Sequence, residues 1–152
     1  MNIYLKYLVA AIWSFLLVPA AMAVELKPDD QAVVAQGKTI YRSQCAACHG
    51  RSLRGQARWR KRRANGKLPA PPHDKSGHTW HHPGSVLFNI TKFGPAEMIG
   101  GDYKTDMPGF KDILSDEEII AVLSYIKSTW PADLRRRHDA MEQRHRRYNF
   151  SG

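Results

Sequence analysis

The chain has 152 residues, with 23 lysines and arginines against 14 aspartates and glutamates, and only two cysteines. This length indicates one small domain, and two cysteines are too few for a disulfide-stapled scaffold. A formal net charge of +9 often accompanies nucleic-acid binding, but the export signal described next argues against that class; an acidic protein partner or an anionic membrane surface fits better.

The first 23 residues have the pattern of a secretory signal peptide. Lys6 precedes an apolar run at residues 8–18, and Ala21, Met22 and Ala23 form an A-x-A cleavage site. The run is short for a bilayer span, which needs about 20 residues. We therefore expect cleavage after Ala23 and a periplasmic location, with an uncleaved membrane anchor as the less favoured alternative. The mature chain then divides into a domain at residues 24–131 and a basic tail at 132–152.

One helix is expected in the first third of the chain and a second, shorter one after its middle. Asp29 or Asp30 can cap a helix that runs to Cys45, and Gly37 within it indicates that another backbone comes close. A short helix is predicted over residues 85–93, followed by a long loop at 94–109. The chain contains no convincing strand, so the sequence predicts an all-α fold.

The clearest helix starts at Ser115, which forms an S-x-x-E capping box with Glu118. Its apolar positions lie on one face and the segment closes at Trp130. The tail that follows is polar, and either a frayed amphipathic helix or disorder fits its pattern.

Residues 51–67, here called the basic insert, contain eight lysines or arginines and no acidic residue. Such runs are usually solvated faces. The functional alternative is electrostatic docking of an acidic redox partner, which raises the association rate and weakens with salt. The docking candidates are Arg60, Lys61, Arg62 and Arg63.

Cys45, Cys48 and His49 form the motif C-x-x-C-H. A thioredoxin-like site should follow a strand, whereas this one follows a helical pattern; a closed zinc site needs four ligands. A disulfide alone leaves His49 unexplained. Covalent attachment of one haem uses all three residues, with thioethers from both cysteines and His49 as the proximal iron ligand.

The sixth iron ligand has three methionine candidates in the mature chain. Met107 precedes a proline, which biases it toward an extended loop conformation. Met98 also lies in a loop, and Met141 lies in the charged tail. Spacing favours Met107 only modestly. A thioether ligand raises the haem potential relative to a second histidine.

A group of histidines surrounds Trp80; its members are His73, His78, His81 and His82. Imidazole suits copper, so a second metal site is one interpretation. The other is a polar loop whose histidine and tryptophan side chains donate hydrogen bonds around a cofactor, and we favour that one over copper.

The sequence up to Trp130 resembles the class I, single-haem c-type cytochromes. The resemblance is carried by Gly37 and Tyr41 before "CAACHG", by "MPGF", and by "LSDEEIIAVLSYIKSTWP". It implies a small all-α cytochrome c fold wrapped around one covalently attached haem. Carried over by position, Cys45 and Cys48 bind haem, and His49 and Met107 are the axial ligands.

The resemblance implies further contacts. Gly37 and Tyr41 should cross the terminal helix against Val122 and Tyr125. A proline carbonyl should accept the ring N–H of His49, and Pro69 is the candidate. The expected haem-pocket residues are Pro69, Phe93 and Ile126.

The expected function is therefore a periplasmic single-electron carrier rather than an enzyme. Its partners would be redox proteins with acidic docking surfaces, with weak association to a membrane surface as a second expectation. The alternatives are a copper-handling protein, a haem subunit of a larger oxidoreductase complex, or a haem protein that reacts with gases or peroxide if Met107 is not a ligand.

Overall fold

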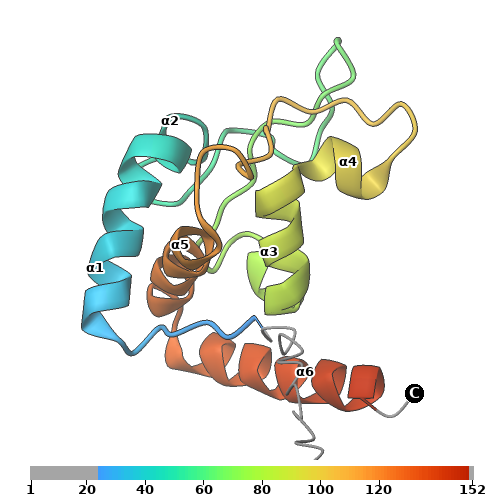
Figure 1. Ribbon diagram of the computed structural model, residues 1–152. Helices are drawn as coiled ribbons and strands as arrows, with labels where there is room; N and C mark the ends of the chain where they lie inside the picture. The colour runs from blue at the N-terminus through green and yellow to red at the C-terminus, as the bar shows by residue number, and fades with distance from the viewer. Residues whose placement is uncertain (1–23, 151–152) are drawn as a thin grey trace, which may run out of the picture.

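The computed structural model describes residues 24–150, which form a helical bundle (Figure 1). The predicted signal peptide lies outside the described residues. The elements are α1 (Gln31–Ile40), a π-helical turn (Tyr41–Cys45), α2 (Ala46–His49), a 3-10 turn (Thr79–His81), α3 (Gly84–Phe93), α4 (Pro95–Ile99), α5 (Asp116–Ser128) and α6 (Ala132–Phe150). No strand occurs between residues 24 and 150, and the all-α prediction is confirmed.

The crossing of α1 and α5 forms the centre of the fold. A Cβ added to Gly37 would lie 2.0 Å from the carbonyl oxygen of Ala121 and 2.9 Å from the Cβ of Tyr125. The predicted glycine crossing is therefore present, although Gly37 meets Ala121 rather than the neighbouring Val122. Tyr41 is fully buried one turn later, with its ring 5.5 Å from that of Tyr125.

The ends of both crossing helices follow the sequence. Asp30 caps α1 by accepting hydrogen bonds from the backbone of Ala32 and Val33. Ser115 caps α5, and Glu118 completes the capping box by accepting from the Ser115 backbone. Because these caps satisfy backbone N–H groups that have no partner within the helix, they fix where each helix starts.

The segment after α3 differs from the prediction. The expected helix at residues 85–93 is present as α3, but the expected loop at 94–109 contains a short helix, α4. Pro95 occupies its first turn, where the missing N–H has no partner to lose and the fixed φ suits a helix. Gly94, at φ 84°, separates α3 from α4.

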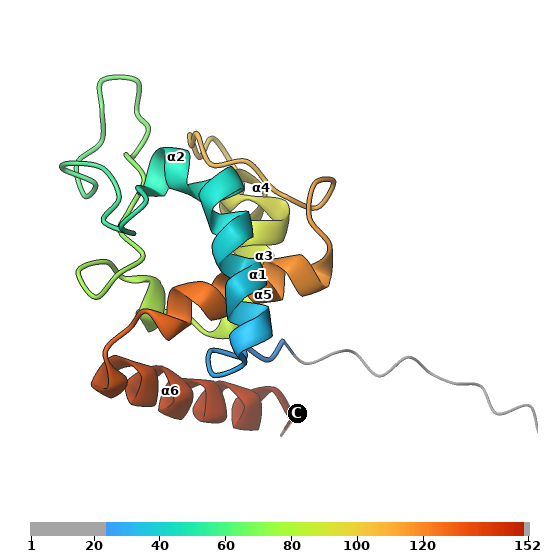
Figure 2. The same cartoon turned by 90° about the vertical axis from the view of Figure 1, so that its left-hand side faces the viewer.

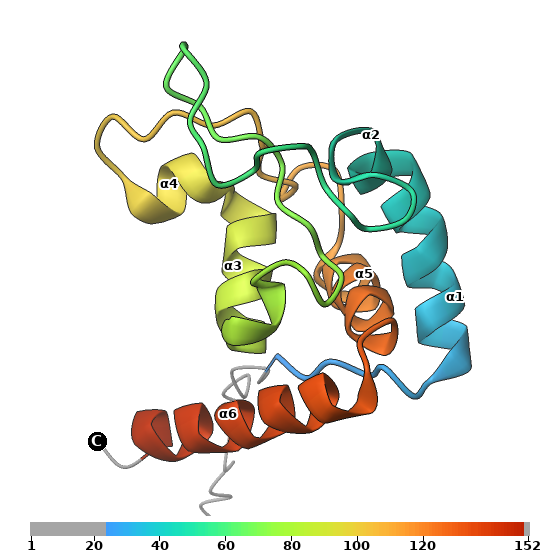
Figure 3. The ribbon, with the colours of Figure 1, turned by 180° about the vertical axis from the view of Figure 1, so that it is seen from behind.

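The basic tail is a helix rather than a disordered segment. α6 runs across one end of the bundle, beside the chain that leads into α1 (Figures 2 and 3). Leu134 and His138 are buried against the body, and the His138 ring lies 5.2 Å from the Trp130 ring. Between residues 24 and 150, no helix is both long and apolar enough to cross a membrane.

Candidate functional site

The C-x-x-C-H motif spans a change in helical geometry. The π-helical turn (Tyr41–Cys45) interrupts the α-helical path of α1, and α2 carries Cys48 and His49. Such turns insert an extra residue into a helix and are frequent at functional sites. The hydroxyl of Tyr41 holds the turn by donating to the carbonyl of Gly50, at 2.9 Å.

No disulfide joins Cys45 and Cys48; Cys45 is half-buried and Cys48 is exposed. Burial, with a smaller contribution from Cys48, raises the pKa of the Cys45 thiol to about 11. Thiol redox catalysis needs a thiolate, which a lowered pKa provides. The environment of Cys45 therefore disfavours a thioredoxin-like role and leaves the thiol as a partner for a covalent bond.

His49 is buried and oriented through its Nδ1 atom. The Nδ1–H donates to the carbonyl oxygen of Pro71 at 2.9 Å, because a carbonyl can only accept. This bond fixes the tautomer in which Nε2 keeps its lone pair. Burial lowers the pKa of His49, which favours the neutral imidazole that binds metal, although the Pro71 bond acts in the opposite direction.

The carbonyl partner of His49 is thus Pro71 and not the predicted Pro69. The proline-rich run is anchored on both sides, with the Gln56 N–H donating to Ala70 and the His73 N–H donating to Leu53. These two hydrogen bonds set the register of the run relative to α2. Sequence comparison across the basic insert does not contain that information, which explains the error of two residues. Pro69 itself is buried.

His73 contacts the face of His49, a placement that the sequence did not indicate. The two imidazole rings stack with centroids 4.0 Å apart and an interplanar angle of 25°. The Nδ1 of His73 lies 2.9 Å from the hydroxyl of Thr79, and its carbonyl accepts from Trp130 Nε1 at 2.8 Å. These bonds hold the His73 ring against the proposed proximal ligand.

The other histidines of the group contact aromatic rings and one another; the rings of His78 and His82 lie edge-on with their centroids 5.4 Å apart. His78 stacks on Trp59, and His81 stacks on Trp80 at 3.6 Å. The carbonyl of His82 lies 3.1 Å from His138 Nε2. Among residues 24–148, no set of three or more histidine, cysteine, aspartate or glutamate side chains is arranged to hold a metal ion. These residues therefore provide no set of ligands for a copper ion.

Met107 is held in a loop that packs against the bundle. Its side chain is half-buried against the hydrophobic core, whereas Met98 is 42% exposed on α4. The next residues are fixed to α3 by the Phe110 N–H, which donates to the carbonyl of Lys92 at 3.0 Å. A Cβ on Gly109 would lie 2.6 Å from the carbonyl oxygen of Phe93, so the glycine of "MPGF" permits this close approach. Met141 lies on α6, away from this loop (Figure 1).

The Cytochrome c family model matches residues 34–130, from within α1 to the second residue after α5. The chain belongs to the cytochrome c family. No curated protein and no solved structure matches it. Family membership makes the protein a haem c-containing electron-transfer protein, and α6 lies outside the matched range.

The residues of this cytochrome fit the haem group that the family implies. Cys45 and Cys48 would hold it covalently, and His49 presents a neutral imidazole. Trp80 supplies a separate observation: its Nε1–H is buried without a hydrogen-bond partner in the described part of the chain. A buried N–H left unpaired costs about 1–3 kcal/mol, so it indicates a missing acceptor. A carboxylate of the haem is an acceptor of the right chemistry.

Two of the predicted pocket residues lie in helices that flank the loop. Ile126, on α5, is buried in the hydrophobic core of this cytochrome. Phe93 ends α3, and its carbonyl lies under Gly109. Phe93 therefore adjoins the segment that carries Met107.

The basic insert contacts the loop that leads to Met107. Asp106 forms ion pairs with Lys67 and, at 4.0 Å, with Arg63. The guanidinium of Arg62 lies 5.5 Å from the centre of the Tyr103 ring. Part of the predicted docking cluster is therefore used inside the cytochrome, to hold the loop. Arg60 lies over Trp59, and Lys61 is exposed.

Proposed function

We propose that this cytochrome carries single electrons in the periplasm through one haem with His49 and Met107 as axial ligands. The observation that supports this proposal most strongly is the way in which the His49 ring is held. Its ring is buried, its Nδ1–H is committed to Pro71, and one face rests on His73. An imidazole held in this way has one nitrogen left for a metal, and the acceptor on the other nitrogen makes it a better donor.

The haem supplies a one-electron iron couple when it is bound. The chain's own residues determine how that couple is used. Met107 comes from a loop fixed to α3 and packed against the core, which suits a permanent thioether ligand. With both axial positions taken by side chains, substrates are excluded from the metal, and the protein transfers electrons instead of catalysing a reaction.

The ligand assignment is tested by replacing Met107 with leucine. Leucine conserves the volume but lacks the sulfur, so we expect the far-red absorption band of the oxidised, haem-loaded protein to disappear and the potential to fall. Met98→Leu is the matched control and should keep both properties. A wild-type band in Met107→Leu would overturn the assignment, and loss of the band in Met98→Leu would assign the ligand to Met98 instead. Pyridine haemochrome spectra of both variants report whether the haem is still attached through both thioethers.

The docking proposal for this carrier concerns the basic insert. Its loop projects from the end of the molecule that carries α2 (Figure 1), and Cys48 in α2 is exposed. An acidic redox protein bound at the insert would therefore lie near the attachment edge of the haem. Arg60 and Lys61 are the exposed cations best suited to such docking, because Arg62 and Arg63 also contact the chain itself.

A further inference from the structure

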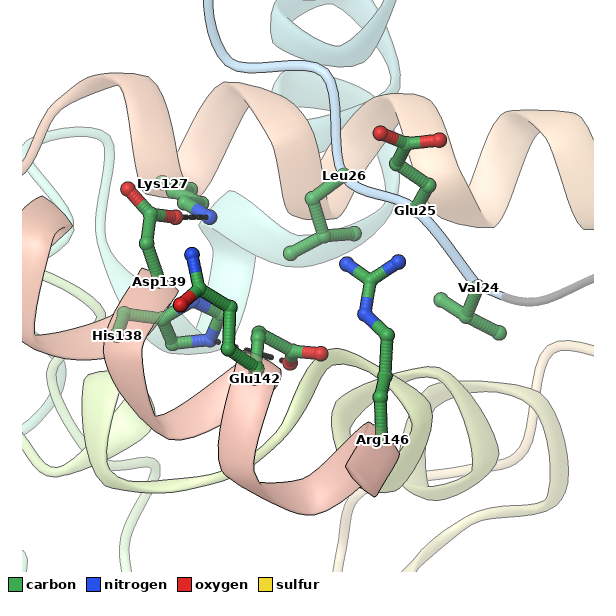
Figure 4. Close-up of a pocket in the computed structure, with 9 residues that line it drawn as sticks. Val24, Glu25, Leu26, Lys127, His138, Asp139, Glu142 and Arg146 are labelled. Atoms are coloured by element: carbon green, nitrogen blue, oxygen red, sulfur yellow. Dashed lines mark hydrogen bonds and ion pairs between the residues drawn. The ribbon is translucent and has the colours of Figure 1, made fainter. Parts of the chain in front are cut away.

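The outer side of α6 carries a set of exposed arginines, here called the arginine face. Its members are Arg136, Arg137 and Arg144. The acidic residues of α6 do not neutralise this face well, because two of them are turned toward the body. Asp139 pairs with Lys127 at 2.6 Å (Figure 4), and the buried Glu142 accepts from the Gly84 N–H. Asp133 alone is exposed without such a bond among the described residues.

The inner side of α6 is committed to the protein. Leu134 and His138 are buried, and Arg135 pairs with Asp29 at 2.5 Å, ahead of α1. A helix that lies in a bilayer interface must bury an apolar face among the lipids. That face is not available here, so α6 can meet a membrane only through charge, as a rigid row of cations above the headgroups.

The position of α6 distinguishes a membrane from a redox protein as its partner. α6 lies at the end of the molecule opposite α2, with the α1 and α5 crossing between them, in all three views (Figures 1, 2 and 3). A redox protein bound to the arginine face would lie far from Cys48, where electron transfer is poor. A surface that only needs to hold the cytochrome has no such restriction.

The start of the described chain lies on the same side of the molecule as α6. Val24, the first described residue, lines one cavity together with Arg146 of α6 (Figure 4). The apolar run at residues 8–18 comes just before it in the sequence. The described chain therefore begins beside α6, at the end of the molecule opposite α2.

We propose that the arginine face of α6 binds the anionic phospholipid headgroups of a membrane and leaves the Cys48 end facing away from it. This binding does not depend on the ligands of the haem iron. Electrostatic attraction to an anionic surface acts on each lysine or arginine close to it and decays within a Debye length. The attachment is therefore reversible and sensitive to salt.

The test measures binding of the haem-loaded protein to vesicles by co-sedimentation at low salt. The vesicles are either phosphatidylcholine alone or phosphatidylcholine with one quarter phosphatidylglycerol. We expect binding to the anionic vesicles only. The triple variant R136Q/R137Q/R144Q should weaken it by roughly two orders of magnitude. The variant R54Q/R60Q/K61Q removes the same charge from exposed positions of the basic insert that do not contact the Met107 loop, and it should bind nearly as well as wild type.

Three outcomes would overturn the proposal. One is equal binding to neutral vesicles. Another is a larger loss of binding in the insert variant than in the α6 variant. The third is complete competition by soluble polyglutamate at the same concentration of negative charge, which would identify a surface for acidic polypeptides. Glutamine keeps the helix propensity of arginine, and the haem absorption spectrum of each variant shows that it is folded.

Discussion

His49 is held by its own helix and by one distant segment, which contains both Pro71 and His73. The π-helical turn and α2 bring it inward, the proline-rich run supplies the Pro71 carbonyl, and His73 covers one face of its ring. His73 is in turn held by Trp130, which follows α5. The position, tautomer and rotation of the ring are therefore fixed by the protein itself. A ligand held in this way keeps the reduction potential of a bound haem iron constant.

Gly37 gives a prediction at the same scale. Glycine to alanine within a helix normally stabilises by up to about 1 kcal/mol. At Gly37 the sign should reverse, because the added Cβ would overlap the Ala121 backbone, and overpacking of this kind costs about 1–3 kcal/mol. We expect Gly37→Ala to lower the free energy of unfolding by about 2 kcal/mol in denaturant titrations. Gln36→Ala, on the exposed side of α1, should change it by less than about 0.5 kcal/mol, and equal effects would contradict the crossing.

At the scale of elements, α6 is tied to the segment that carries the histidine group. His138 of α6 is buried against the body, and its Nε2 lies 3.1 Å from the carbonyl oxygen of His82. The hydroxyl oxygen of Ser85 lies 3.3 Å from Nε2 of His145. Burial lowers the pKa of His138, and the charge of Lys127 lowers it further, against smaller opposing effects of Glu142, the His82 carbonyl and Asp139. The folded protein therefore keeps His138 neutral at pH values where the unfolded chain protonates it.

This arrangement predicts a pH dependence of stability. The contribution of neutral His138 is complete above the unfolded histidine pKa of about 6.5 and is lost as the pH falls below that value. We expect the free energy of unfolding to decrease from pH 7.5 to pH 5.5, with His138 contributing a slope of at most about 1.4 kcal/mol per pH unit. His138→Gln should have a shallower slope in denaturant titrations across this range. Identical slopes in the two proteins would show that His138 is accessible to protons in the folded state.

The whole molecule has two positively charged regions at opposite ends. The basic insert lies at the end with α2, and the arginine face lies on α6 (Figure 2). The insert also holds the Met107 loop through Lys67 and Asp106, so its charge serves both the fold and the proposed docking. We propose that separating the two regions lets one protein meet a redox partner at one end and an anionic surface at the other.

The redox role of the insert predicts a salt dependence. The rate at which an acidic redox protein reduces this cytochrome should fall steeply as ionic strength rises, because screening removes the steering. Stopped-flow measurements should show a weaker dependence in R60Q/K61Q and an unchanged one in the α6 variant R136Q/R137Q/R144Q. A rate that is independent of salt in wild type would exclude electrostatic docking at the insert.

The sequence alone determined the features that depend on neighbouring residues. The C-x-x-C-H motif can be read from the order of five neighbouring residues. The capping box at Ser115 and the helix at residues 85–93 are also local, because hydrogen bonds within one or two turns decide them. A glycine inside a helix also indicates a close backbone; the family resemblance supplied the terminal helix as its partner, where Tyr125 is met as expected and Ala121 takes the place of Val122.

Tertiary structure decided what depends on contacts between distant segments. It selected Pro71 rather than Pro69, placed the His73 ring on His49 and joined the basic insert to Asp106. It also buried the Trp80 N–H, which has no hydrogen-bond partner between residues 24 and 150. It also turned a polar tail into α6. Each of these depends on the register and approach of segments far apart in the chain, which packing of the whole core fixes and local pattern does not encode.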